Sequence, residues 1–302
     1  MSAADPPATD VISPDRLRYA GVFGRVVWRN LMRYALSPCP LEARPLRIPN
    51  RTPNLWAGWL GHATVLLHFF GRLLLTDPVL TNHLALSRRL VRLPLQPERI
   101  PPLDAVLITH AHCDHLHRAS LRLLPRGQRI IVPHGCADLV ADLGSSPTEL
   151  GWGQEMNIGE VRIRAFRPRH WGRRPPLGGE RGYNSYLLTC RGHSVLVAGD
   201  SAYTEAFQQA CHGSHVSLAL LSIGCYQPAF FRRAHLTPED ALRVFREIEA
   251  DYMLPIHWGT FIISLEPPAQ PARRLLAEAT RLGLTERVRL VWPGGDFTYP
   301  GT

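Results

Sequence analysis

Histidine and aspartate residues are concentrated in one short segment of this 302-residue sequence. Residues 109–115 read T-H-A-H-C-D-H and directly follow an apolar run. Side chains of an extended chain alternate in direction, so His110 and His112 point the same way, and Asp114 and His115 lie on the turn beyond. Imidazole and carboxylate ligands together suit zinc, and iron or manganese less often. The segment therefore predicts a metal site with ligands for two neighbouring ions.

Three further candidate ligands each end another apolar run that reads as a buried strand. They are His170, Asp200 and His257. In layered α/β proteins, ligand-binding side chains gather at the carboxyl ends of such strands. If the strand ends converge on one edge of the fold, these residues complete the ligand shells of two metal ions.

The order of these motifs resembles the metallo-β-lactamase superfamily of hydrolases, over residues 55 to 292. The elements are H-x-H-x-D-H, a histidine, an aspartate after Ala-Gly, and a last histidine. The resemblance implies an α/β fold, a single-domain four-layer αββα sandwich, with two zinc ions along the sheet edges. By the same resemblance, one zinc would be held by His110, His112 and His170, the other by Asp114, His115 and His257, with Asp200 bridging the two.

Several short motifs are similar to one branch, N-acylphosphatidylethanolamine-hydrolysing phospholipase D and its bacterial relatives. They include W-L-G-H-A-T at 59–64, T-D-P at 76–78 and P-I-H-W-G-T-F at 255–261. In that branch a further histidine precedes a helix, and here it is His235. One departure is His117, which stands where the branch often has aspartate and is expected to support the ligands.

A second departure is a set of arginines around His170, namely Arg167, Arg169, Arg173 and Arg174. Guanidinium groups bind phosphate well. These arginines either hold an anionic phosphate or flank an exposed loop, and the sequence leaves both interpretations open.

The resemblance implies a dinuclear zinc hydrolase, a phosphodiesterase of phospholipase D type that acts on N-acylphosphatidylethanolamine-like phospholipids. A hydroxide held between two zinc ions is nucleophilic at neutral pH. Asp114 or Asp200 would orient it, and His235 would donate a proton to the leaving oxygen or stabilise charge. Asp114 and His235 are therefore the candidate catalytic residues. The alternatives are hydrolysis of lactones or other small carboxyl derivatives, RNA processing, and a metal-dependent binding protein without turnover.

The elements that must position these residues follow from hydrophobic patterning. Strands are expected at 55–60, 63–70, 72–76, 105–108, 129–132, 161–166, 185–188, 194–198, 218–222 and 252–256. Helices are expected at 118–124, 135–143, 203–211, 237–250 and 271–282. Thr237 is the expected N-cap of the fourth helix, with Pro238 at its first position. This alternation predicts a layered α/β fold.

Residues 1–50 are interpreted as an N-terminal tail with an amphipathic helical extension, and residues 51–302 as the hydrolase domain. The expected helix spans residues 17–36 and carries apolar residues such as Val22 and Val26 on one face and arginines on another. It either lies on an anionic membrane or packs on its own domain. The leucine- and arginine-rich segment 80–103 leaves the same two interpretations open.

Composition limits the class of protein. All 34 basic residues are arginine, and the net charge is +9. No apolar run approaches the ~20 residues of a membrane span, and no secretory signal is visible. We therefore expect a soluble, cytoplasmic protein, and peripheral membrane contact stays open. Phospholipid or a small molecule is the expected substrate, nucleic acid is not expected because no separate basic module occurs, and a homodimer stays open.

Six cysteines occur without a C-x-x-C pair, so reduced thiols are expected. Cys113, inside the metal segment, is left without a role.

Overall fold

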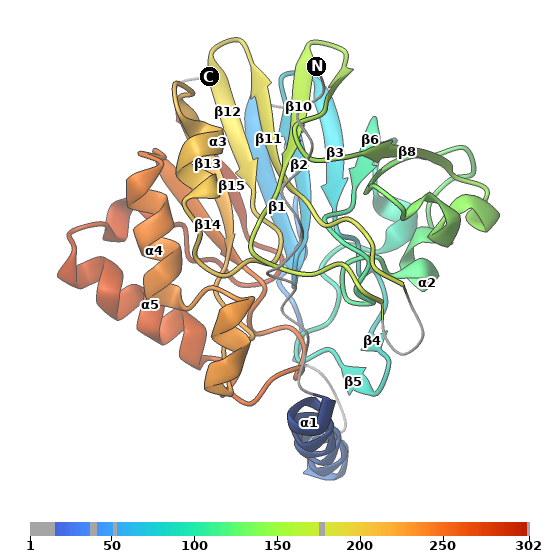
Figure 1. Ribbon diagram of the computed structural model, residues 1–302, viewed down its shortest axis with the longest axis vertical. Coiled ribbons are helices and arrows are strands. Elements are labelled where there is room, and N and C mark those ends of the chain that lie inside the picture. The colour runs from blue at the N-terminus through green and yellow to red at the C-terminus, as the bar shows by residue number, and fades with distance from the viewer. Residues whose placement is uncertain (1–15, 37–40, 51–52, 175–178, 301–302) are drawn as a thin grey trace.

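Two β-sheets packed face to face form the centre of the protein in a computed structural model that describes residues 16–36, 41–50, 53–174 and 179–300 (Figure 1). The first sheet has the order β15-β1-β2-β3-β6-β7-β8, and the second has the order β14-β13-β12-β11-β10-β9. The first is built from β1 (Leu55–Gly61), β2 (Thr64–Phe69), β3 (Arg72–Thr76), β6 (Ala105–Leu107), β7 (Arg129–Pro133), β8 (Ser146–Leu150) and β15 (Asp296–Thr298). The second is built from β9 (Glu155–Ile158), β10 (Val161–Phe166), β11 (Ser185–Cys190), β12 (His193–Val197), β13 (Val216–Ser222) and β14 (Tyr252–Ile256).

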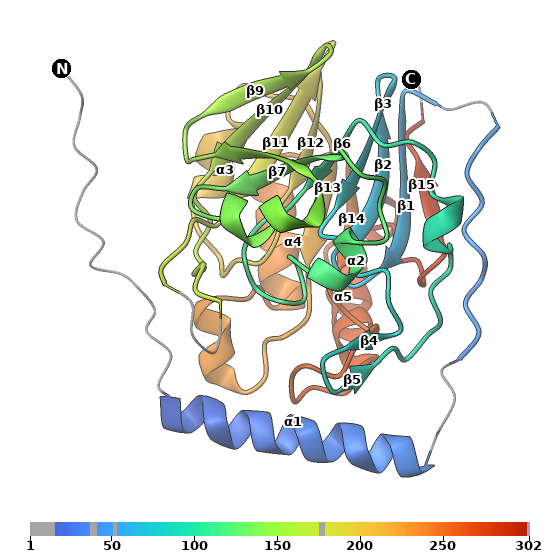
Figure 2. The ribbon, with the colours of Figure 1, turned by 90° about the vertical axis from the view of Figure 1, so that its right-hand side faces the viewer.

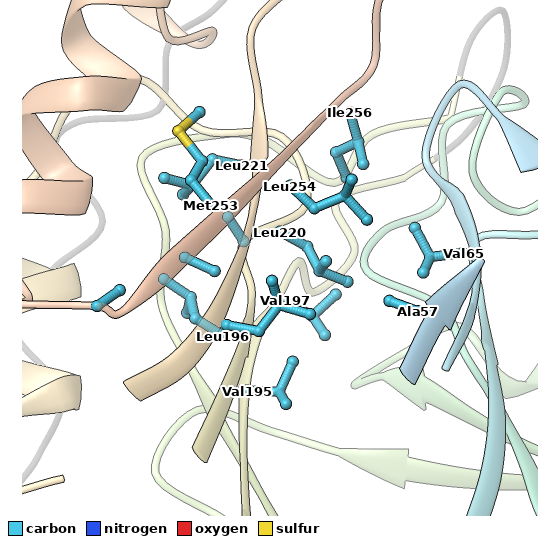
Figure 3. Close-up of a cluster of buried hydrophobic side chains, with 14 of the residues drawn as sticks. Ala57, Val65, Val195, Leu196, Val197, Leu220, Leu221, Met253, Leu254 and Ile256 are labelled. Carbon is cyan, nitrogen blue, oxygen red and sulfur yellow. The ribbon is translucent and has the colours of Figure 1, made fainter. Parts of the chain in front are cut away.

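The main hydrophobic core lies between the two sheets. Figure 3 shows part of it, where Ala57 and Val65 of the first sheet lie across from Val197 and Leu220 of the second. The next residue of β2, Leu66, points to the opposite face and packs in a separate cluster on the outside of the first sheet. Strands buried on both faces explain why these runs are almost continuously apolar in the sequence.

Helices cover the outer faces of both sheets, which gives the predicted four layers. They are α2 (Arg118–Leu121) on the first sheet, and α3 (Ala206–Cys211), α4 (Pro238–Glu247) and α5 (Gln270–Arg281) on the second. The predicted cap of α4 is present, because Thr237 Oγ1 accepts a hydrogen bond from the Asp240 backbone at 3.1 Å. The Asp240 carboxylate in turn accepts from the Thr237 backbone at 3.2 Å.

Several elements differ from the sequence prediction. The helix expected at 135–143 is instead two short 3₁₀ segments, Ala137–Leu139 and Ala141–Leu143, and neither has a side-chain cap. β8 and β9 were not predicted, because their residues are largely polar and their strands lie at sheet edges. Edge strands are often short and carry polar or charged side chains, so their hydrophobic alternation is weak.

A small hairpin projects from the first sheet and consists of β4 (His83–Leu84) and β5 (Ser87–Arg88). The buried guanidinium of Arg89 anchors it by donating to the carbonyl oxygens of Leu60 at 3.0 Å and Val79 at 2.6 Å. Leu84 is buried, whereas Leu86 at the turn is 59% exposed. The segment 80–103 therefore packs on its own domain and still presents one apolar side chain outward.

Helix α1 (Arg16–Leu36) crosses the end of the molecule near this hairpin (Figure 2). Val22 is buried against Cys225 and Phe231. Arg29 does not share an outward basic face, which corrects the predicted pattern, because its Nη1 donates to the Ser264 carbonyl at 3.0 Å. The apolar side of α1 thus packs on its own domain. Among the described helices, none combines the length and the apolar character needed to cross a bilayer.

Candidate metal centre

The strand directions bring the predicted ligands to one edge of the two sheets. β12 and β14 both run parallel to β13, so Asp200 and His257 follow strand ends on the same side. β10 is antiparallel to β11, which is antiparallel to β12, so β10 also ends there, ahead of His170. In the first sheet, β6 leads into His110. The two edges meet, and the side chains from both sheets form a single cluster.

Three imidazoles form the first group of possible metal ligands, as the resemblance implied. His110 Nε2 lies 2.8 Å from His112 Nδ1, and His170 Nε2 lies 3.4 Å from the same atom. Nitrogen ligands of a tetrahedral zinc ion, at Zn–N distances of about 2.0–2.1 Å, lie about 3.3 Å apart. The three nitrogens are therefore spaced as ligands of one ion.

The second group holds Asp114, His115 and His257, and the structure adds His62 to it. Asp114 Oδ2 lies 3.6 Å from the Nε2 atoms of both His115 and His257, and 3.1 Å from His62 Nε2. Asp200 lies between the two groups. Its Oδ2 is 3.2 Å from His115 Nε2 and 4.0 Å from His110 Nε2. All seven predicted ligands are thus brought together.

Sequence reasoning assigned no role to His62, although a signal was present. His62 follows β1, an apolar strand like those that precede the predicted ligands. Because β1 and β3 are both antiparallel to β2, and β3 is parallel to β6, β1 ends at the same edge as β6. His62 and His257 both have positive φ angles, and the His257 N–H donates to the His62 carbonyl at 2.8 Å. This bond joins the edges of the two sheets.

The hydrogen bonds behind the cluster leave lone pairs facing inward. His170 Nδ1 donates to the Ala234 carbonyl at 3.0 Å, and His115 Nδ1 lies 2.7 Å from the Asp77 carboxylate. His110 Nδ1 is 3.0 Å from Thr109 Oγ1, whose hydroxyl donates to Asp77. A neutral imidazole carries one proton, so the rings of His110 and His170, whose pKa values burial lowers, present an unprotonated Nε2 to their neighbours, and His115 does so once its ring is neutral. Converging lone pairs of nitrogen and oxygen fit a bound cation.

Asp77 is the common anchor of the metal segment. Its buried carboxylate also accepts a hydrogen bond from the Thr109 backbone at 2.7 Å, directly before His110. The T-D-P motif at 76–78 contains Asp77, but the sequence alone indicated no role for this residue. Carboxylates that orient ligand histidines in this way fix both the ring orientation and the proton position.

Burial and charge set the protonation of the cluster. Burial lowers the pKa of His112 to about 4 and that of His62 to about 3, so both rings are neutral at pH 7. For His115, burial favours the neutral ring, but the carboxylates of Asp200, Asp114 and Asp77 outweigh it and raise its pKa well above the usual range.

His235 lies beside the cluster and is only 7% exposed. Its Nδ1 is 3.6 Å from Asp200 Oδ2. Burial lowers the pKa of His235 to about 4. The side chain lines an apolar cavity of about 310 Å³ that also reaches Asp114 and Asp200. The structure therefore places His235 where a substrate bound at the cluster would meet it.

The arginines near His170 have different surroundings. Arg174 Nη1 donates to the carbonyls of Ala111 at 2.6 Å and Leu116 at 3.0 Å, so it braces the metal segment from outside. Arg167 lies over the Trp152 ring at 4.7 Å. His117 contacts Ser120 Oγ at 2.7 Å and is in neither group of candidate ligands. The contacts of Arg174 therefore favour a role in supporting the backbone over a role in phosphate binding.

Known proteins are similar to this chain in sequence and in fold. Residues 72–258 match the model of the beta-lactamase superfamily domain. An uncharacterized protein of Mycobacterium tuberculosis is 31% identical over 98% of this chain and 82% of its own length. The mitochondrial N-acyl-phosphatidylethanolamine-hydrolyzing phospholipase D of Saccharomyces cerevisiae is 29% identical over 76% of this chain and 53% of its own length. The crystal structure of isothiocyanate hydrolase from Delia radicum gut bacteria superposes with a TM-score of 0.66 at 20% identity, over 81% of this chain and 99% of that one.

Proposed function

Because the chain belongs to the beta-lactamase superfamily, we propose that it is a dinuclear zinc phosphodiesterase of phospholipase D type that acts on N-acylphosphatidylethanolamine-like phospholipids. The superfamily, the αββα fold and a metal-dependent hydrolase, all predicted from the sequence, are confirmed by this membership. Zinc, the number of ions and the bond that is cleaved are proposed beyond it. The observation that carries the proposal is the convergence of two ligand groups around the shared carboxylate of Asp200.

In this proposal His110, His112 and His170 would hold one zinc ion, Asp114, His115 and His257 would hold the other, and Asp200 would contribute to both. A zinc pair lowers the pKa of a bound water to near 7 and thereby supplies a nucleophile at neutral pH. The side chain of Asp114 is 17% exposed and lines the cavity, so its carboxylate can accept a hydrogen bond from the attacking water and orient it.

His235 is the proposed proton donor to the leaving oxygen. It is the one histidine at the cavity floor that lies outside both ligand groups. Its Nδ1 lies 3.6 Å from Asp200 Oδ2. The lowered pKa keeps the ring neutral at pH 7, so in this proposal the N–H of the neutral imidazole donates to the leaving oxygen. We expect His235→Ala to retain the metal and to lower kcat about 100-fold or more. The exposed His212 provides a matched control, His212→Ala, which should leave both unchanged.

Two measurements on the purified protein test the metal and the reaction together. Elemental analysis should find about two zinc ions per chain, and bis(4-nitrophenyl) phosphate should be hydrolysed in a reaction that chelator abolishes. His112→Ala should remove both metal and turnover, and Asp200→Asn should lower the occupancy of both ions. Two ions without diester hydrolysis would favour the lactone or other small carboxyl substrates. Absence of metal would refute the proposal.

Phospholipid is proposed as the natural substrate on two grounds. The yeast relative is named for hydrolysis of N-acylphosphatidylethanolamine. Helix α1 exposes the large apolar side chains of Phe23, Trp28, Leu31 and Met32, between 41% and 66% each. Apolar residues on a helix of a basic protein suit the surface of an anionic bilayer.

Vesicle flotation tests the membrane contact. The protein should float with vesicles of phosphatidylglycerol and phosphatidylcholine, and the double variant Trp28→Ser, Leu31→Ser should stay in solution. Leu276→Ser is the matched control, because Leu276 is 44% exposed on α5, which is a different helix. Equal flotation of the double variant and the wild type would show that α1 is not the contact surface.

A further inference from the structure

The cavity above the metal ligands has walls of different chemistry from its floor. Asp114, Asp200 and His235 lie at the floor. The walls are apolar side chains from four separate segments of the chain. They are Val22, Phe23, Val26 and Val27 of α1, Leu84 and Leu86 of the β4–β5 hairpin, Phe231, and Ile262 with Ile263. Substrates must therefore present a polar reacting group to the floor and an apolar group to the walls.

Helix α1 forms one of these walls, and it is fixed in place by specific contacts. The side-chain amide of Asn30, 3% exposed, donates to the Ile262 carbonyl at 3.0 Å. Arg29 donates to the Ser264 carbonyl at 3.0 Å on the same segment. Val22 packs on Phe231 and Cys225. The face of α1 that carries Val22 and Asn30, here called the inner face, is thus held against the site, at the end of the molecule that α1 crosses (Figure 2).

We propose that the inner face of α1 determines substrate specificity: Val22 and Val26 limit the length and bulk of the apolar group that can lie beside the reacting bond. This inference rests on the proposed hydrolase function. It adds that the substrate carries an apolar chain on the side of the reacting group that faces α1. At about 310 Å³ the cavity is near the lower end of small-molecule sites, roughly 300–1,000 Å³. The described position of α1 therefore admits one chain of limited length.

A series of phosphodiesters that differ only in chain length tests the proposal. The substrates are 4-nitrophenyl phosphate esters with a methyl, butyl, octyl or hexadecyl group. Each methylene group buried by the cavity can raise kcat/KM by up to about fourfold. We expect kcat/KM to rise from methyl to octyl and then to level off or fall, because the cavity is filled.

Two substitutions at Val26 change the cavity in opposite directions. Val26 is only partly buried, so its replacement disturbs the core less than replacement of Val22. Val26→Trp should lower kcat/KM for the octyl ester about 10-fold or more relative to kcat/KM for the methyl ester. Val26→Ala should raise the chain length at which activity levels off. Leu276→Trp adds the same bulk to an exposed position of α5 and should have no effect.

The outcomes separate this inference from the proposed function. An equal fall for all chain lengths in Val26→Trp, or no change at all, would overturn the role of α1 while the phosphodiesterase stands. If no diester is hydrolysed, calorimetric titration with dodecylphosphocholine below its critical micelle concentration tests the role of α1 through binding alone. Wild type and Leu276→Trp should bind this lipid, and Val26→Trp should bind it at least 10-fold more weakly. Equal binding by all three proteins would refute the role of α1 in specificity.

Discussion

At the scale of single residues, His62 links the candidate metal ligands to the sheet edge. It hydrogen-bonds to Asp114 Oδ2 at 3.1 Å and has a φ angle of 53°. Asparagine tolerates positive φ better than most residues, so His62→Asn removes the imidazole with little backbone strain. We expect the affinity for the ion at Asp114, His115 and His257 to fall about 10- to 100-fold.

Competition with a chromophoric chelator measures this affinity. His212→Asn, at an exposed position, is the control. Unchanged affinity for both ions in His62→Asn would mean that Asp114 needs no support from His62.

Asp77 gives a second prediction at this scale. Its carboxylate accepts from His115 Nδ1 and from the backbone and hydroxyl of Thr109, all at 2.7 Å. In Asp77→Asn an amide NH2 group, which donates hydrogen bonds, replaces one carboxylate oxygen. His115 Nδ1 therefore loses its acceptor, or the His115 ring changes the nitrogen that carries its proton. The cobalt-substituted variant should show an altered visible absorption spectrum and about 10- to 100-fold weaker metal binding. An unchanged spectrum would contradict the positioning role of Asp77.

At the scale of elements, a single side chain can hold a whole helix in place. For α1 that side chain is Asn30, which donates to the Val26 and Ile262 carbonyls. Asn30→Ala leaves the buried Ile262 carbonyl without this partner, at a cost of about 1–3 kcal/mol to the docking of α1. Hydrogen exchange of the amides of residues 21–32 should become faster, with little change in the melting temperature.

Thr280→Ala is the control for this prediction, because Thr280 makes its hydrogen bond to Leu276 within α5. If α1 exchanges at the same rate in Asn30→Ala and in the wild type, the amide of Asn30 does not hold the helix.

At the scale of the whole molecule, the cluster of candidate metal ligands joins the two sheets, so we expect metal binding and folding to be coupled. Ions that bind only the folded state stabilise it by about 4 kcal/mol when the free ion exceeds its dissociation constant 1,000-fold. For a domain of this size about 1 kcal/mol corresponds to roughly 2–4 °C. Chelation should therefore lower the melting temperature by about 10 °C, and added zinc should restore it. Equal melting curves with and without chelator would refute the coupling.

The chelated protein should also lose stability in acid. The folded-state pKa values of His62, His112 and His235, about 3, 4 and 4, lie below the ordinary value of 6.5. The unfolded chain therefore takes up protons first, and stability is lost as the pH falls from 6.5 toward 4. His115 opposes this, because its raised pKa contributes stability at low pH that is lost as the pH rises. Three lowered groups outweigh one, so the melting temperature should be lower at pH 5 than at pH 7.

The sequence by itself determined the features that depend on neighbouring residues. The spacing of His110, His112, Asp114 and His115 was informative because a strand end and the turn after it are local geometry. The cap of α4 at Thr237 was predicted for the same reason, since its partner lies three residues away.

Only the tertiary structure decided which distant residues meet. His62 joined the ligands because the order and direction of β1, β2, β3 and β6 carry it to the shared edge, which no local pattern records. The position of α1 over the site was decided by Asn30 and Ile262, which are separated by 232 residues. Hydrophobic periodicity reports that a face is buried, but it does not report what covers it, because packing partners are chosen by the whole fold.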